Sequence, residues 1–324
     1  MGMVIDGKWI DDDEKYRNPT GGAFVRAESV WRDSVTADGS SGFKAEPGRY
    51  HLFLAPSCPW AHRTQIVRRL KGLEDVISVT LSDLPRITSW AYTKGIDELQ
   101  PGDNGKLELH EVYVAADPNY TGRVTVPTLW DRQKKTIVNN ESSEIIRMLN
   151  TEFDEWATND LPDLYPEAHR AEIDALNERI YETINNGVYR CGFAKTQEAY
   201  EEYIYPMFET LDFLEDRLSK QRYLAADYPT EADWRLFVTM IRFDFVYFSH
   251  FKCNIRRIQD YPNLWNWTLE LYQTPGIADV VDIPGIKKGY YGGQANVNPT
   301  GIVPVGPDLD LTVPHNRGGV ARAA

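Results

Sequence analysis

The sequence predicts an α/β domain followed by an all-α domain, and three observations support that fold class. First, an apolar run at 50–54, a helix-like stretch at about 60–71 and a β-branched run at 76–81 follow one another. Second, a hairpin-like segment at 126–139 precedes a helix-like stretch at 142–149. Third, apolar residues in the second half recur at spacings of three and four, as in packed helices. Strand–helix–strand followed by hairpin–helix is the order of a thioredoxin-like sheet, so we expect a thioredoxin-like domain before the helices.

Local features justify the elements of the first half. The stretch at 60–71 carries an apolar face that includes Ile66 and Leu70, and Gly72 is placed to cap its end. A polar insertion at 93–109, with a Pro-Gly-Asp-Asn-Gly loop, separates the second strand from the hairpin. Residues 1–45 are rich in Gly, Asp and Ser without a sustained period, so we expect an irregular arm.

The second half predicts helices at 169–188, 200–218, 234–241 and 263–272. Thr230 and Asp233 form a capping-box-like start to the third of them. After Gly285 the chain is rich in Gly, Pro and Asn, and we expect about the last fifteen residues to be mobile. The predicted domains are an arm at 1–45, a thioredoxin-like domain at 46–155, an all-helical domain at 165–285 and a C-terminal extension at 286–324.

Composition excludes several classes of function. The formal net charge is −13, which argues against a nucleic-acid partner because phosphate binding needs a basic face. The three cysteines have neither the number of a disulfide framework nor the spacing of a metal site, so we expect no bound metal. The N-terminus does not resemble a signal peptide, and no segment has the apolar length of a membrane span. We therefore expect a soluble, cytoplasmic protein with no membrane partner.

Cys58 is the first candidate for chemistry. It follows the apolar strand and precedes the basic helix, where backbone N–H groups converge and the helix dipole favours a thiolate. Ala61 stands where a dithiol motif would have its second cysteine, so a small soluble thiol must complete any exchange. A buried and inert cysteine is the alternative, and the flanking Pro59 and basic helix favour the reactive interpretation.

Val126-Pro127 is the second candidate. In thioredoxin-like sheets a proline at this position is cis and faces the redox cysteine, which leaves the preceding backbone free to pair with a peptide ligand. An isolated Val-Pro is more often an ordinary loop, but Cys58-Pro59 upstream favours the binding role.

The helix start at Glu141 and Ser142 is the third candidate. Its N–H groups and hydroxyl could bind a carboxylate, and Glu141 could accept from an ammonium, as the end of a γ-glutamyl group requires. A simple N-cap is the alternative. Tyrosines form the fourth group, with Tyr189, Tyr247 and the Tyr290-Tyr291 pair as possible proton donors near a thiolate, although most tyrosines only pack.

Together these motifs resemble the cytosolic glutathione transferase superfamily, and in particular the glutathionyl-hydroquinone reductases, the Xi class related to the Omega class. The resemblance extends over nearly the whole chain. The segments that carry it are 58–63, 116–127, 138–146, 185–194 and 230–235, with Tyr290-Tyr291 and Asn298-Pro299-Thr300 in the extension.

The resemblance implies roles for matching residues. Cys58 would be the nucleophile and Tyr189 the proton donor, with Tyr247 and Tyr290 close enough to help hold the thiolate. The residues implied to bind the co-substrate glutathione are Trp90, Arg123, Val124, Thr125, Val126 (through its backbone), Glu141 and Ser142.

The implied reaction is the reduction of a glutathionyl-hydroquinone to the hydroquinone through a Cys58–glutathione mixed disulfide, with release of oxidised glutathione by a second glutathione. The resemblance also implies a homodimer. Two alternatives stay open: an Omega-like thiol transferase or dehydroascorbate reductase, and a non-catalytic binding protein of the same fold.

Overall fold

The structure is a computed structural model that describes residues 2–11 and 28–320. The described chain divides into two compact units, the first ending at Leu161 and the second beginning at Pro162. This division has no separate arm or extension, so the predicted limits of those two segments stay predictions.

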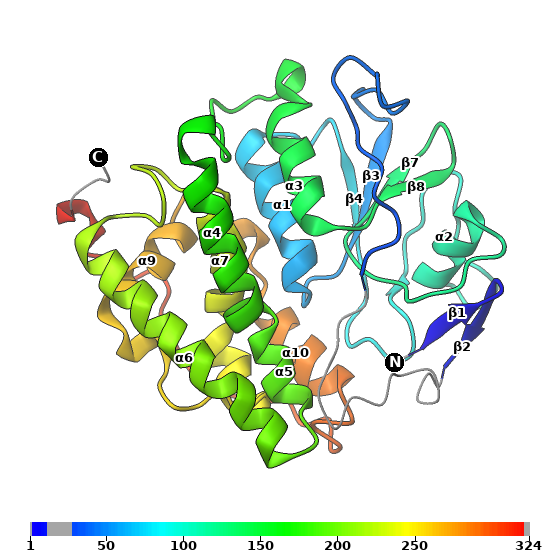
Figure 1. Cartoon of the computed structure of the whole chain (residues 1–324). Coiled ribbons are helices and arrows are strands. Elements are labelled where there is room, and N and C mark those ends of the chain that lie inside the picture. Colours follow the sequence, from blue (N-terminus) through cyan, green and yellow to red (C-terminus); the bar gives the residue numbers. More distant parts are fainter. Residues whose placement is uncertain (1, 12–27, 321–324) are drawn as a thin grey trace. The chain divides into compact units, whose positions relative to one another are not determined.

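The first unit contains a mixed four-stranded sheet with the order β4-β3-β7-β8. Strand β3 pairs in parallel with β4 and antiparallel with β7, and every residue of β3 is buried. Figure 1 shows α1 and α3 on one face of this sheet and α2 on the other. The elements of this unit are β1 Met3–Ile5, β2 Lys8–Ile10, β3 Tyr50–Leu54, α1 Pro59–Lys71, β4 Ser78–Leu81, β5 Ala91–Tyr92, β6 Leu107–Glu108, α2 Leu109–Ala116, β7 Thr128–Asp131, β8 Thr136–Asn139 and α3 Ser142–Thr151.

Helix α1 has the ends that its sequence predicts. Pro59 occupies the first turn, where its missing N–H costs nothing. Gly72 ends the helix in the left-handed conformation at φ 67°, and its N–H donates to the carbonyl groups of Arg68 and Arg69. The predicted apolar face is buried, with Ile66 and Val67 fully inaccessible.

Two features of the first unit were not predicted. The arm expected to be irregular contains a hairpin of β1 and β2, and Val4 and Gly122 exchange backbone hydrogen bonds of 2.9 Å in both directions. Three-residue strands are too short to show a period, which is why the sequence did not reveal them. The polar insertion ends in the unpredicted helix α2, which begins with a capping box between Glu108 and Glu111.

The second unit is helical, as predicted. Its helices are α4 Arg170–Ile180, α5 Gly187–Phe193, α6 Gln197–Lys220, α7 Glu231–Arg242, α8 Phe248–His250, α9 Pro262–Tyr272 and α10 Ile283–Gly293. The predicted capping box is present at α7, where the Thr230 N–H donates to Asp233 over 2.9 Å.

Two π-helical turns interrupt the predicted helical pattern. The stretch predicted as one helix at 169–188 is α4, a π turn at Tyr181–Asn185 and then α5. A second π turn, Phe243–Tyr247, joins α7 to α8. Each π turn contains an additional residue, so the side chains that follow leave the phase of the preceding helix. Tyr247 lies within such a turn, and Tyr189 lies just after one.

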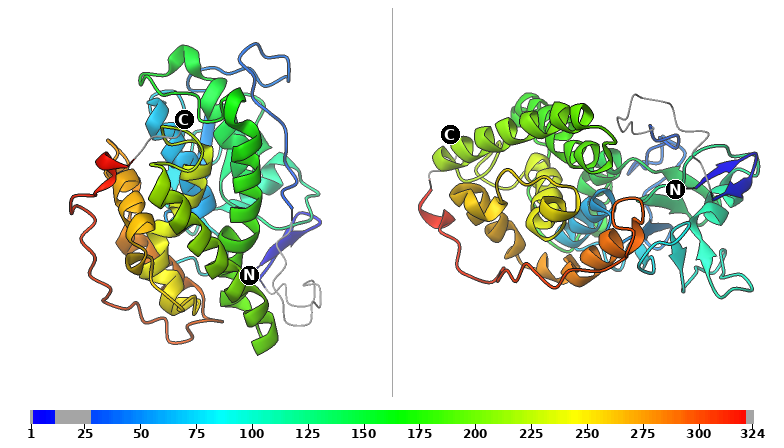
Figure 2. Two further views of the ribbon diagram at one scale, coloured as in Figure 1. Left: turned by 60° about the vertical axis from the view of Figure 1, so that its left-hand side comes forward. Right: turned by 90° about the horizontal axis from the view of Figure 1, so that it is seen from below.

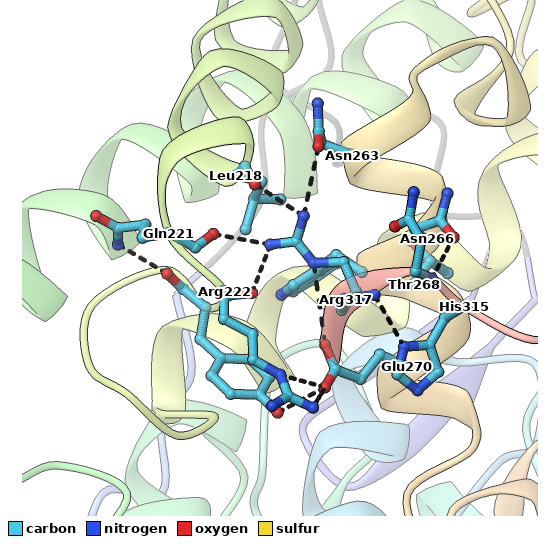
Figure 3. Close-up of polar contacts among 12 residues, drawn as sticks. Leu218, Gln221, Arg222, Asn263, Asn266, Thr268, Glu270, His315 and Arg317 are labelled. Atoms are coloured by element: carbon cyan, nitrogen blue, oxygen red, sulfur yellow. Dashed lines mark hydrogen bonds and ion pairs between the residues drawn. The ribbon is translucent and has the colours of Figure 1, made fainter. Parts of the chain in front are cut away.

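The C-terminal end differs most from expectation. Helix α10 forms in a segment predicted only to be rich in Gly, Pro and Asn, and the chain after it runs along the helical unit (Figure 2). The expectation that about the last fifteen residues are mobile is wrong for Arg317. Figure 3 shows its guanidinium in a socket, donating to the carbonyl groups of Leu218 at 2.8 Å, Gln221 at 2.7 Å and Arg222 at 2.8 Å. The sequence reveals the arginine but not the carbonyl groups that hold it.

Candidate active site

Cys58 is the N-cap residue of α1, directly after β3. Its N–H donates to the carbonyl of Ala55 and its own carbonyl accepts from the N–H of His62, each over 3.0 Å. The side chain is partly exposed, and the first turn of α1 has no acidic residue. The positive end of the helix therefore acts on an accessible sulfur, and such a setting favours a thiolate.

The cysteine sulfur lies beside the predicted proline. The Val126–Pro127 peptide bond is cis, as predicted, and the Cys58 thiol donates to the Val126 carbonyl with an Sγ–O distance of 3.6 Å. A Cys58 thiolate could no longer donate to this carbonyl, and the positive end of α1 would stabilise its negative charge.

The start of α3 is an N-cap formed by Glu141. One oxygen of its carboxylate accepts from the N–H and hydroxyl of Ser143 at 3.0 and 2.9 Å, and the other accepts from the Ser29 hydroxyl at 3.1 Å. Ser142 is buried, and its hydroxyl accepts from Arg63 over 3.4 Å. Glu141 is therefore the N-cap of α3, as the alternative interpretation had it. Its carboxylate, held in place by these bonds, could still accept a hydrogen bond from an ammonium group.

Two unpredicted residues hold the loop that contains the predicted glutathione residues. The Tyr113 hydroxyl donates to the Thr125 carbonyl at 3.0 Å, and Asn140 donates to the same hydroxyl at 2.9 Å. These contacts fix the backbone just before Val126. Tyr113 lies on the unpredicted helix α2, whereas Asn140 precedes Glu141 and was within reach of sequence reasoning.

The remaining predicted binding residues belong to the same unit. The Tyr120 hydroxyl donates to the Arg123 carbonyl over 2.7 Å. Val124 is half-buried. Trp90 is also half-buried, and the Arg86 guanidinium lies 4.7 Å from the centre of its ring. Their contact with glutathione stays a prediction.

Three predicted tyrosines of the second unit come together, and we call Tyr189, Tyr247 and Tyr290 the tyrosine cluster. The Tyr290 hydroxyl lies 2.6 Å from that of Tyr189 and 2.8 Å from that of Tyr247. Burial raises the pKa values of Tyr247 and Tyr290 well above the ordinary value, so both stay protonated at neutral pH. The Tyr290 hydroxyl therefore links the other two hydroxyl groups, and a phenol can both donate and accept a hydrogen bond.

Phe251 packs against every member of the tyrosine cluster. It stacks on Tyr247 at 5.6 Å and meets Tyr189 and Tyr290 edge-on at 5.5 and 5.7 Å. Such contacts limit how far the rings can turn. Sequence reasoning missed Phe251 because no motif marks an apolar ring whose importance depends on its neighbours.

Among residues 2–11 and 28–320, no helix is long and apolar enough to cross a membrane. The same part of the chain contains no group of three or more His, Cys, Asp or Glu residues that could hold a metal ion.

Comparison with known proteins identifies the family. The models for the N-terminal and C-terminal domains of glutathione S-transferase match residues 57–152 and 197–269. The glutathionyl-hydroquinone reductase PcpF of Sphingobium chlorophenolicum is 52% identical, over 96% of this chain and 98% of the relative. The glutathionyl-hydroquinone reductase YqjG of Escherichia coli is 47% identical, over 98% of both chains. This chain belongs to the glutathionyl-hydroquinone reductase family.

Solved structures agree with that assignment. The Xi-class glutathione transferase of Natrialba magadii matches with a TM-score of 0.89 and 46% identity, over 99% of this chain and 98% of the other. The glutathione-bound structure of E. coli YqjG matches with a TM-score of 0.86 and 44% identity, over 98% and 99%. The predicted family and the predicted fold class of this glutathionyl-hydroquinone reductase family member are confirmed.

Proposed function

We propose that this chain uses glutathione to reduce glutathionyl-hydroquinones to hydroquinones. The observation that carries the proposal is a single partly exposed cysteine at a helix N-terminus, beside the Val126 carbonyl, in a chain with Ala61 in place of a second thiol. The names of the two relatives that match nearly their whole length support the same reaction and the same co-substrate.

The reaction has two steps, and only the second is a thiol–disulfide exchange. The Cys58 thiolate attacks the sulfur of the glutathionyl-hydroquinone, and the carbon–sulfur bond breaks as an S–S bond forms. The ring carbon takes a proton, so hydroquinone leaves and Cys58 stays joined to glutathione. A second glutathione thiolate then attacks this mixed disulfide, which releases oxidised glutathione and restores the Cys58 thiolate. Two thiol-level sulfurs are oxidised to one disulfide, and the hydroquinone carbon is reduced.

The tyrosine cluster supplies the proton in this proposal. Tyr189 donates to the substrate and favours the keto tautomer of its ring, which makes carbon a tolerable leaving group. Tyr290 holds the Tyr189 hydroxyl at 2.6 Å and is itself held by Tyr247 at 2.8 Å. We further propose that Tyr247 and Tyr290 help to hold the Cys58 thiolate.

Glutathione is bound by the first unit in this proposal. The Val126 backbone pairs with the peptide, while Glu141 and Ser142 at the start of α3 receive the γ-glutamyl end. The further residues proposed for this site are Trp90, Arg123, Val124 and Thr125. We also propose that the protein is a cytoplasmic homodimer, which light scattering and cell fractionation can test.

A paired assay tests the function. Purified chain is given glutathione with either a glutathionyl-hydroquinone or a small mixed disulfide, and the products are separated by chromatography. We expect release of hydroquinone, loss of that activity in Cys58→Ala, and retention of it in the matched control Cys253→Ser under reducing conditions. Reduction of the mixed disulfide without release of hydroquinone would instead assign the Omega-like activity. Full activity in Cys58→Ala would refute the assignment of Cys58 as the nucleophile.

A further inference from the structure

The motif Asn298-Pro299-Thr300 of the C-terminal extension has no role in the proposed reaction. The Asn298 amide group donates to the carbonyl of Tyr291 at 2.8 Å and to that of Ile302 at 2.9 Å. Its oxygen accepts from the Thr300 hydroxyl at 3.2 Å. Tyr291 belongs to α10, whereas Ile302 lies beyond the motif. Asn298 therefore fastens the chain after α10 to the backbone of the helix itself.

Lys287 of α10 fastens the same segment a second time. We call residues 294–317, which run along the helical unit (Figure 2), the strap. The Lys287 ammonium donates to the strap carbonyl groups of Val305 at 2.8 Å and Gly306 at 2.9 Å. Lys287 is buried, whereas the next residue, Lys288, is exposed. A buried ammonium needs acceptors in place of water, and these two carbonyl groups supply them.

Hydrogen bonds rather than apolar burial hold the middle of the strap. The side chains of Ile302 and Val305 are not buried, since these residues are 68% and 100% exposed. A pocket of about 400 Å³ lies between this stretch and α10, lined by helix residues such as Lys287 and strap residues such as Val303. The strap is therefore not packed closely on the helix here, and the bonds from Lys287 and Asn298 attach it.

Helix α10 depends on such contacts, because its own sequence favours a helix only weakly. Its eleven residues include four glycines and a proline. Glycine is among the least favourable residues within a helix, and so short a helix is stabilised mainly by tertiary packing. The helix carries Tyr290, whose hydroxyl contacts those of Tyr189 and Tyr247. The position of the Tyr290 hydroxyl therefore depends on the contacts that hold α10 in place.

The two fastenings flank Tyr290 along the helix. Lys287 precedes it by three residues, which is about one helical turn. Tyr291, whose carbonyl accepts from Asn298, follows it directly. This second fastening uses the Tyr291 carbonyl and not its hydroxyl, so it does not depend on the side chain at that position. Loss of either fastening should loosen the part of α10 that presents Tyr290 to Tyr189.

We propose that Lys287 and Asn298 are positioning residues for the reaction. By attaching α10 to the strap, they keep the Tyr290 hydroxyl where it orients the proton donor Tyr189. This role rests on the proposed function, because the position of Tyr290 affects the rate only if Tyr189 gives its proton to the substrate. Loss of the whole Tyr290 hydroxyl should lower the rate about tenfold, so a loosened helix that keeps this hydroxyl should lower it by less, about threefold to fivefold.

The first test measures the helix without reference to activity. Full-length wild type, Lys287→Met and the matched control Lys288→Met are placed in deuterated buffer, and mass spectrometry follows hydrogen exchange in the peptides that cover α10. Methionine is unbranched like lysine but has no proton to donate. We expect faster exchange across α10 in Lys287→Met alone, since its backbone hydrogen bonds open more often. Exchange at the wild-type rate in Lys287→Met would overturn the proposal.

The second test separates positioning from a general loss of stability. Single-turnover measurements follow the two steps in turn: release of hydroquinone by the reduced enzyme, and release of oxidised glutathione from a preformed Cys58–glutathione disulfide. Only the first step places a proton on carbon. We expect Lys287→Met to slow the first step about threefold to fivefold and to leave the second unchanged, with both steps unchanged in Lys288→Met. Equal slowing of both steps, or of neither, would refute the positioning role.

Asn298→Ala is an independent variant, with the exposed Asn296→Ala as its control. We expect the same pattern of exchange and rates as in Lys287→Met, and this variant decides the proposal if Lys287→Met does not fold. If the wild type releases no hydroquinone in the first step, the proposed function fails and the positioning role fails with it. Hydrogen exchange then still decides whether the strap holds α10.

Discussion

Replacing Tyr290 with Phe removes a single oxygen and with it both hydrogen bonds of the tyrosine cluster. The bonds to Tyr189 and Tyr247 are 2.6 and 2.8 Å long, and all three side chains are buried. A hydrogen bond contributes about 1 kcal/mol net, with a spread of roughly 0.5, so the variant should lose about 1–3 kcal/mol of stability. Tyr247→Phe removes only one of the bonds and should lose about half as much.

The effect on catalysis should exceed the effect on folding. Without Tyr290, the Tyr189 hydroxyl loses the partner that orients it, whereas its ring keeps the contacts with Phe251. General acid catalysis contributes roughly a hundredfold to ten-thousandfold, so partial loss of orientation should lower kcat about tenfold. Removing the donor itself in Tyr189→Phe should lower kcat by about a hundredfold or more.

Tyr291→Phe is the matched control. Its hydroxyl contacts Ser249 and donates to the Phe245 carbonyl at 3.3 Å, outside the tyrosine cluster. It should therefore lose comparable stability and keep its kcat. Urea denaturation gives the free energy of unfolding of each variant, and hydroquinone release under saturating glutathione gives kcat. Equal kcat values for Tyr290→Phe and Tyr291→Phe would refute the assignment of the cluster to proton transfer.

Three further predictions follow from other parts of the structure. Arg317→Lys keeps the positive charge but loses the branched guanidinium that reaches three carbonyl groups. We expect the free energy of unfolding in urea to fall by about 2–4 kcal/mol, against less than about 0.5 kcal/mol for the exposed control Arg256→Lys. Equal losses would contradict the role given to these three hydrogen bonds. Because burial raises the pKa values of Tyr247 and Tyr290, their contribution to stability is complete below about pH 10 and falls as the pH rises further, when only the unfolded chain ionises them. Replacing Tyr247 and Tyr290 together with Phe should make the free energy of unfolding decline less steeply between about pH 10 and 11. An unchanged slope would contradict the assignment of this decline to the two tyrosines. Glu141→Gln should raise the KM for glutathione about tenfold and lower the melting temperature slightly, since Gln keeps only one of the two oxygens that accept hydrogen bonds at the start of α3. Glu144→Gln, which removes a carboxylate paired with Arg32, should leave KM unchanged.

Local sequence determined much of the first unit. The run at Tyr50–Leu54 is apolar apart from His51, and every one of its residues is buried, because a central strand is covered on both faces. Pro59 and Gly72 determine where α1 begins and ends, since each acts on its own backbone. The cis peptide before Pro127 was also predicted, and the N-cap at Glu141 had been left open as the alternative at this helix start. Both depend on residues close in the chain.

The elements that the sequence did not reveal either are too short for a period or have a composition that does not favour a helix. Strands β1 and β2 contain three residues each, and α10 contains four glycines and a proline. The π turns also escaped prediction, since residues at 169–188 keep a helical rhythm across the inserted residue. Packing against neighbours compensates for weak local preference in each case.

The sequence by itself determined the family, the fold class and the identity of the candidate nucleophile, because motifs around Cys58, Val126 and Glu141 are local. Only the tertiary structure decided which distant groups form hydrogen bonds with each other. Tyr189 and Tyr290 are 101 residues apart and share a hydrogen bond, and Arg317 finds its acceptors at the end of α6 and in the turn after it. Contacts of this kind depend on the folded path of the chain, which brings together groups that no spacing in the sequence relates.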